Sequence, residues 1–129
     1  MSPLGHTIID VIFLLNGVYD LACAVSILSG VGFLSSLHPA MFTNSPDPIV
    51  RRLLAYWLFT YGTARTAAGL HRDLGLDLVG SLTYFIEALC FEYECRYGGT
   101  MVASKVTFVS IFSFVLGILV NFIFASSCN

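Results

Sequence analysis

The chain has 129 residues, of which 57% are hydrophobic and only 11% are charged, and its formal net charge is −2. Soluble domains usually carry about a quarter charged residues, because a globule needs them to cover its surface. Six basic and eight acidic side chains are too few for that purpose, so we expect the surface to lie largely in lipid. The slightly acidic balance also argues against nucleic-acid binding, which needs a basic patch. The length suits a single domain over residues 1–129.

Four apolar segments predict four transmembrane helices, over residues 7–28, 53–70, 76–94 and 102–125. A helix needs roughly 20 residues to cross the hydrocarbon core. The fourth segment is the clearest, because no charged residue lies between Val106 and Asn129. The second and third are shorter and contain charges, so they are expected to cross only as members of a bundle. The alternative for the third is an amphipathic helix on the membrane surface. The sequence predicts an all-α membrane protein, a four-transmembrane-helix bundle with short loops.

The links between these segments are polar and rich in proline or glycine. The first runs through Pro39, Pro46 and Pro48 and is predicted to be non-helical, while residues 71–75 and 97–100 form short turns. Basic residues are unevenly divided between the two ends of the bundle. The first and third links hold Arg51, Arg52, Arg96 and Lys105, whereas the opposite end holds only Arg72. The positive-inside rule therefore places the first and third links in the cytosol or mitochondrial matrix, and both termini in the opposite compartment.

Three charged residues, Asp20, Arg65 and Glu87, lie deep within the predicted spans. A charge near the bilayer centre costs roughly 2.5–3.5 kcal/mol on insertion scales, so it is expected to have a partner or a function. Counting from the hairpin turn places Arg65 and Glu87 about one helical turn apart, which an arginine side chain can bridge. We expect Arg65 to pair with Glu87 or with Asp20. The pair either holds the bundle in register, anchors a partner subunit, or lies on a proton pathway.

The third segment carries two carboxylates, Glu87 and Glu94, on one face together with Tyr84 and Phe91. Carboxylate metal sites in helix bundles usually include Glu-x-x-His motifs, and this sequence has none. It also lacks a Gly-rich phosphate loop, a nucleophile elbow and a Cys/His cluster. The sequence therefore predicts no metal, no cofactor and no enzymatic activity.

Small residues form one face of the second segment and part of the first. Gly62, Thr66 and Gly69 share the face of the second, and Gly17 and Ala24 give the first a similar surface. Such faces let membrane helices approach closely. They suit packing inside the bundle and packing against other membrane proteins.

One set of residues follows the spacing of a known family. In the second segment these are Arg52, Trp57 and Arg65. In the third they are Thr83, Phe91 and Glu94, followed by Gly99-Thr100, and Phe42-Thr43 precedes both segments. With these residues, the stretch from 42 to 100 resembles the ergosterol biosynthetic protein twenty-eight family, whose members are small four-span scaffold proteins of sterol biosynthesis. Cys90 and Tyr93 depart from the family pattern, which tends to place histidine and serine there.

The resemblance implies a non-catalytic scaffold of the endoplasmic-reticulum membrane that tethers sterol C-4 demethylation enzymes to one another. Its partners are then other integral membrane proteins and membrane lipids. An accessory subunit of a respiratory or ATP synthase complex in the mitochondrial inner membrane is an alternative. A small proton- or ion-conducting protein that uses Asp20, Arg65 and Glu87 is a second, and an enzyme of sterol-isomerase type that uses the third-segment carboxylates is a third.

Overall fold

The computed structural model describes residues 3–127, a range that is mostly helical and contains no β-strand. Each of the four predicted segments corresponds to one long helix. These helices are α1 (Pro3–Ser29), α3 (Pro48–Leu70), α4 (Leu74–Tyr93) and α5 (Ala103–Ser127). The shorter elements are α2 (Leu34–Leu37), the 3-10 turn η1 (Pro39–Met41) and the π-helical turn η2 (Glu94–Gly98), which continues α4.

Three of the helices are long and apolar enough to cross a membrane, over Pro3–Ser29, Leu74–Gly98 and Ala103–Ser126. Three such helices indicate a membrane-embedded protein. The fourth long helix, α3, has 23 residues and is also long enough by itself. It is less apolar, because Arg51, Arg52 and Arg65 all belong to it.

The sequence placed the helix ends imperfectly, and proline and glycine explain the differences. α3 begins at Pro48 and not at residue 53, because a proline in the first helical position has a suitable φ and needs no hydrogen-bond partner for nitrogen. The third segment continues beyond Glu94 to Gly98, and Gly99 ends it with a φ of 65°. The first link, predicted to be non-helical, contains the short helical elements α2 and η1.

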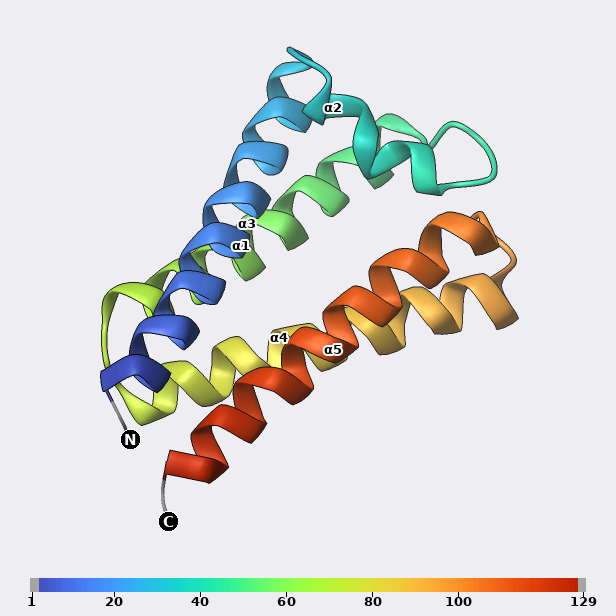
Figure 1. Ribbon diagram of the computed structural model, residues 1–129. Coiled ribbons are helices and arrows are strands. Elements are labelled where there is room, and N and C mark those ends of the chain that lie inside the picture. The colour runs from blue at the N-terminus through green and yellow to red at the C-terminus, as the bar shows by residue number, and fades with distance from the viewer. Residues whose placement is uncertain (1–2, 128–129) are drawn as a thin grey trace.

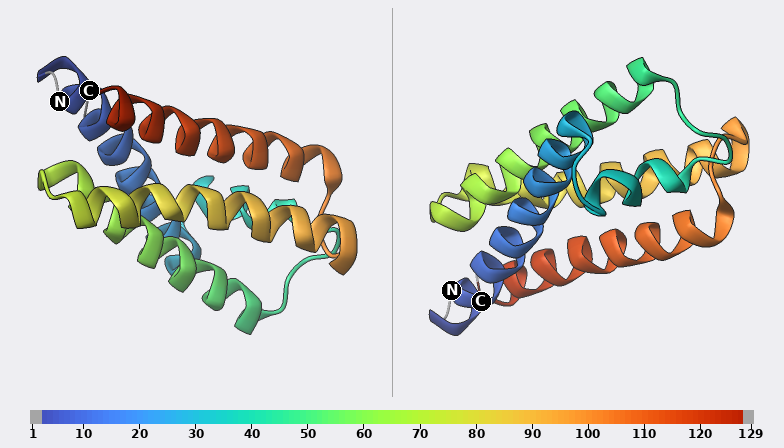
Figure 2. Two further views of the ribbon diagram at one scale, coloured as in Figure 1. Left: turned by 90° about the horizontal axis from the view of Figure 1, so that it is seen from below. Right: turned by 90° about the horizontal axis from the view of Figure 1, so that it is seen from above.

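The long helices form two antiparallel pairs, α1 with α3 and α4 with α5 (Figures 1 and 2). The N- and C-terminal ends and the α3–α4 turn lie at one end of the molecule (Figure 1). The first link and the α4–α5 link meet at the other end. There the backbone N–H of Thr43 donates to the Thr100 carbonyl at 2.9 Å, and that of Val102 donates to the Met41 carbonyl at 2.7 Å.

Glycines bring the backbones of α1 and α3 into direct contact. A Cβ atom added to Gly17 would lie 2.6 Å from the backbone nitrogen of Thr66, and one added to Gly62 would lie 2.9 Å from the carbonyl oxygen of Gly17. Gly69 similarly faces the backbone of α1 at Asp10. The small-residue faces noted in the sequence therefore pack against each other inside the molecule.

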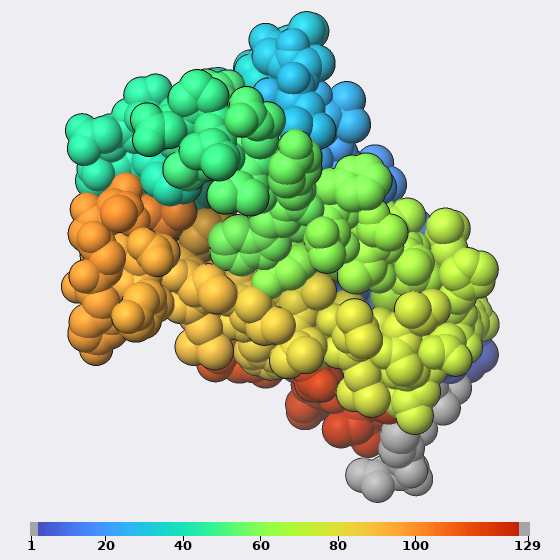
Figure 3. All heavy atoms as spheres, turned by 180° about the vertical axis from the view of Figure 1, so that it is seen from behind, coloured from blue at the N-terminus to red at the C-terminus, as the bar shows by residue number. Residues whose placement is uncertain are grey.

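α1 and α5 converge at the end with the termini and separate toward the other end, whereas α3 and α4 stay in contact there through Trp57 and Phe91. At the converging end, a buried cluster joins α1, α3, α4 and α5; its members are Ile9, Phe13, Ala68, Tyr84 and Val120. Farther along, α1 and α5 diverge, and the α2–η1 segment lies near the opening between them (Figures 1 and 2). Seen from behind, α3 and α4 form one continuous surface (Figure 3). The wedge between α1 and α5 thus opens on one face only.

The close contact of α1 with α3 generates a first prediction. Gly17→Ala should lower the free energy of unfolding by about 1–3 kcal/mol, because the added methyl group meets backbone that cannot move aside. Thermal unfolding in mild detergent measures the effect. The matched control is Gly75→Ala in α4, where the nearest atom is a side-chain oxygen of Asp73 at 3.1 Å. Equal stability of the two variants would show that α1 and α3 are not in backbone contact.

Candidate functional site

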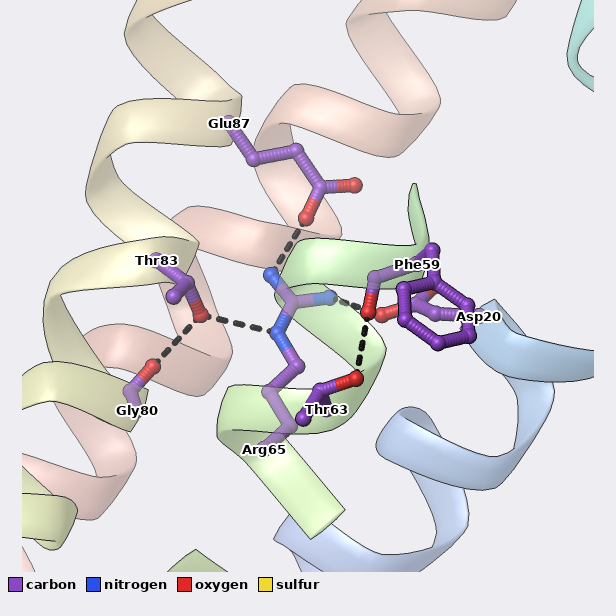
Figure 4. A network of polar contacts seen from close by, with 7 residues as sticks. All are labelled: Asp20, Phe59, Thr63, Arg65, Gly80, Thr83 and Glu87. Atoms are coloured by element: carbon purple, nitrogen blue, oxygen red, sulfur yellow. Dashed lines mark hydrogen bonds and ion pairs between the residues drawn. The ribbon is translucent and has the colours of Figure 1, made fainter. Parts of the chain in front are cut away.

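A buried arginine lies at the meeting point of α1, α3 and α4 (Figure 4). Arg65 of α3 is only 1% exposed. Its Nη1 donates to Oδ2 of Asp20 on α1 at 2.6 Å, and its Nη2 donates to Oε2 of Glu87 on α4 at 2.5 Å. Its Nε donates to the hydroxyl of Thr83, also on α4, at 2.9 Å. We call Asp20, Arg65, Thr83 and Glu87 the arginine cluster.

Aromatic and hydroxyl groups hold the guanidinium of the arginine cluster in place. Its Cζ atom lies 4.1 Å from the ring centroid of Tyr84 and 5.3 Å from that of Tyr61, distances that give cation–π attraction. The Thr83 hydroxyl donates to the Gly80 carbonyl at 2.6 Å, which leaves its oxygen free to accept from Arg65. The guanidinium of Arg65 is therefore held by hydrogen bonds at its edge and by the aromatic rings of Tyr84 and Tyr61.

The arginine cluster contains two carboxylates for one guanidinium. Each carboxylate uses one oxygen on Arg65, and among residues 3–127 no hydrogen-bond donor reaches Oδ1 of Asp20 or Oε1 of Glu87. The free oxygen of Glu87 points away from the guanidinium (Figure 4). With both carboxylates ionised, the cluster carries one surplus negative charge.

The structure combines the two ion pairs that the sequence offered as alternatives, since Arg65 pairs with Glu87 and Asp20 at once. Because Asp20, Arg65 and Glu87 are all buried, their mutual contacts fix three helices in register. Glu94, which the sequence predicts to be a second intramembrane carboxylate on the same helix face as Glu87, lies apart from the arginine cluster, at the end of α4. Its carboxylate accepts a hydrogen bond from the Thr100 hydroxyl at 2.8 Å.

The residues that carry the family resemblance contact one another between α3 and α4. Arg65 bonds Thr83 within the arginine cluster, and the rings of Trp57 and Phe91 lie 5.4 Å apart. Near the α4–α5 link, Glu94 and Thr43 both contact Thr100. Arg52 is exposed near the start of α3. Most of these residues therefore have partners inside the fold.

Two polar residues that the sequence analysis passed over also have marked positions. Asn121 of α5 donates to the Ser81 hydroxyl of α4 and, at 2.7 Å, to the Gly117 carbonyl. A single amide in an otherwise apolar segment was the signal that could have identified it. His38, in the first link, is 7% exposed, and its Nδ1 has no hydrogen-bond partner in the described part of the chain. The sequence gives no sign of that burial, because it depends on how the link folds.

The wedge between α1 and α5 contains two adjoining cavities. One, of about 450 Å³, is lined by Asp20, Glu87 and His38. The other, of about 500 Å³, shares His38 and Tyr19 with the first and extends to Lys105. We call the first the acidic cavity. It is the place where the arginine cluster reaches the surface of the molecule.

Residues 3–127 contain no group of three or more His, Cys, Asp or Glu side chains placed to hold an ion. Comparisons of the chain with protein-family models, curated proteins and solved structures give no match. The site is therefore interpreted from its own contacts.

The arginine cluster generates a second prediction. Arg65→Met should destabilise the protein by about 3–5 kcal/mol, because it leaves two buried carboxylates without their partner. Adding Asp20→Asn and Glu87→Gln should recover most of that loss, since the buried negative charges are then removed as well. Adding Glu87→Gln alone should recover less, because Asp20 stays unpaired. Unfolding in detergent measures all three variants, and a harmless Arg65→Met would refute a structural role for the cluster.

His38 generates a third prediction. Burial lowers the pKa of His38 from 6.5 to about 4. Between these values the unfolded chain binds a proton that the folded chain does not, so stability falls as the pH falls from 6.5 to 4 and is fully present above 6.5. The contribution is about 3 kcal/mol over that window, at 1.4 kcal/mol per pH unit. In His38→Gln the free energy of unfolding, measured at several pH values, should lose that part of its pH dependence, whereas parallel curves for the two proteins would contradict the burial of a neutral imidazole.

Proposed function

We propose that the protein is a non-catalytic scaffold of four transmembrane helices that holds other membrane proteins together in a complex. The observation that carries the proposal is that the buried charged residues pair with one another, whereas the exposed residues are largely apolar. The two ion pairs of the arginine cluster hold α1, α3 and α4 together as one unit. The outer surface carries many exposed large hydrophobic side chains.

Of the three helices that are long and apolar enough to cross a membrane, α5 is the least buried. Only 22% of its most apolar stretch is buried inside the molecule. Large side chains project from most of its circumference; among them are Phe108, Ile111, Phe114, Val115, Ile118 and Phe122. It is held to α4 by Asn121 and by the contact of Gly117 with Phe85. A helix fixed on one side and free on the others is suited to packing against a partner within the membrane.

We further propose that α3 crosses the membrane with the other three helices. Its one deep charge is neutralised by Asp20 and Glu87, and Arg51 and Arg52 lie in its first turns, where they can reach headgroups. The basic residues then place the first and third links in the cytosol or matrix. The four-span layout and the paired motif residues, Arg65 with Thr83 and Trp57 with Phe91, support the resemblance to the sterol-biosynthesis scaffolds.

On that resemblance, the membrane is that of the endoplasmic reticulum and the partners are sterol C-4 demethylation enzymes. The mitochondrial inner membrane, with a respiratory or ATP synthase complex as the assembly, is the alternative. The apolar outer surface of α5 fits both, because either assembly would offer it transmembrane helices.

The scaffold proposal predicts a specific protein neighbour for α5. A photoreactive amino acid at position 118, where Ile118 is 49% exposed, should give a cross-link of defined mass to another membrane protein after purification in mild detergent. The matched control is position 120, where Val120 is 2% exposed and should cross-link only within the chain. If position 118 yields lipid adducts alone and the protein purifies without stoichiometric partners, the scaffold proposal is wrong.

A further inference from the structure

The acidic cavity lies where α1 and α5 diverge, and it has the form of a ligand pocket. Its volume of about 450 Å³, with a further 500 Å³ in the adjoining cavity, falls within the range of about 300–1,000 Å³ typical of small-molecule sites. Leu15, Phe108, Val109 and Phe112 give it apolar walls. Such walls beside the membrane suit a ligand with a hydrocarbon portion.

The polar groups of the acidic cavity favour a cation. Asp20 and Glu87 line it, each with one oxygen that receives no hydrogen bond from residues 3–127, and together they outnumber the positive charge of Arg65 by one. With both carboxylates ionised, an anion would face that surplus charge, and a neutral ligand would either leave it uncompensated in a medium of low polarity or require one carboxylate to take up a proton. Three aromatic rings, those of Tyr19, Phe108 and Phe112, also line the cavity, and aromatic faces attract ammonium groups.

His38 gives an independent indication of a hydrogen-bond donor. It is more than nine-tenths buried, it lines both cavities, and its Nδ1 lacks a partner within the described chain. This atom has almost no accessible surface, so a ligand in the cavity reaches it once the imidazole ring turns. Buried polar atoms are nearly always hydrogen-bonded, so an orphan of this kind calls for a missing group. A neutral imidazole can accept a hydrogen bond at this atom. A protonated amine supplies several N–H donors for the histidine and the two carboxylates.

We propose that the acidic cavity binds the ammonium group of a single-chain hydrophobic amine, with the chain lying along the apolar walls between α1 and α5. Asp20, Glu87 and His38 accept from the ammonium, and the aromatic rings surround it. Lys105 lines only the adjoining cavity, where its Nζ already donates to the Ala40 carbonyl at 2.9 Å, so it leaves the acidic end free of competing positive charge. This inference is independent of the scaffold proposal and does not need a protein partner.

The test uses the full chain in nanodiscs of phosphatidylcholine and a photoreactive octadecylamine as the probe. The probe should label segments of α1 and α5 that line the acidic cavity, and the labelling should saturate. Unlabelled octadecylamine should compete at a concentration at least ten-fold lower than octadecanol, which has the same chain without the charge. Equal competition by the amine and the alcohol would overturn the proposal, because the cavity would then hold hydrocarbon of any kind.

Two variants separate the cavity from general membrane partition of the amine. Val109→Trp, on α5, fills the cavity while keeping every residue of the arginine cluster, and should lower labelling at least ten-fold, whereas Ile118→Trp, on the outer face of α5, should leave it unchanged. Glu87→Gln removes the surplus charge but keeps the Arg65–Asp20 pair, and should weaken competition by the amine to that of the alcohol. Full labelling of Val109→Trp would overturn the proposal even if Glu87→Gln fails to fold.

Discussion

The guanidinium of Arg65 is the interaction on which the arrangement of the helices depends. A charge buried without partners costs several kcal/mol, so the chain is stable only when Asp20, Thr83 and Glu87 reach Arg65 together. These partners come from two other helices, which fixes the position of each along its neighbour. The glycine contact between α1 and α3 serves the same geometry, because it brings the helix carrying Asp20 close enough to bond.

The same ion pairs explain how a membrane-embedded helical protein can contain a helix as polar as α3. Once paired, Arg65 no longer has to reach water, and the remaining charges of α3 lie near its start. α5 contributes no residue to the arginine cluster, and it packs against α1 in the buried cluster toward the termini. The molecule thus consists of a unit of three locked helices with a fourth attached along α4. Much of the surface of α5 is therefore exposed, and the wedge beside it contains the acidic cavity.

The sequence was sufficient to predict the four long helices, because their hydropathy and their proline and glycine punctuation are local signals. It also identified Arg65 with its two possible partners, since unpaired charges in apolar segments are conspicuous. It could not show that Asp20 and Glu87 bind Arg65 at the same time. Asp20 is 45 residues away from Arg65 in the chain, and whether its side chain faces Arg65 depends on how α1 is rotated about its axis. The burial of His38 was equally out of reach, since it follows from the folding of α2 and η1 against a distant link.

The most direct test of this account is the sidedness of α3, because the proposal that this helix crosses the membrane depends on a paired Arg65. Single cysteines at positions 45 and 71, which lie in the exposed links at either end of α3, would be labelled with a membrane-impermeant maleimide in sealed vesicles after the native cysteines are replaced. The account predicts that the two positions react from opposite sides of the membrane. Reaction of both from the same side would mean that α3 does not span, and would contradict the proposed role of the arginine cluster.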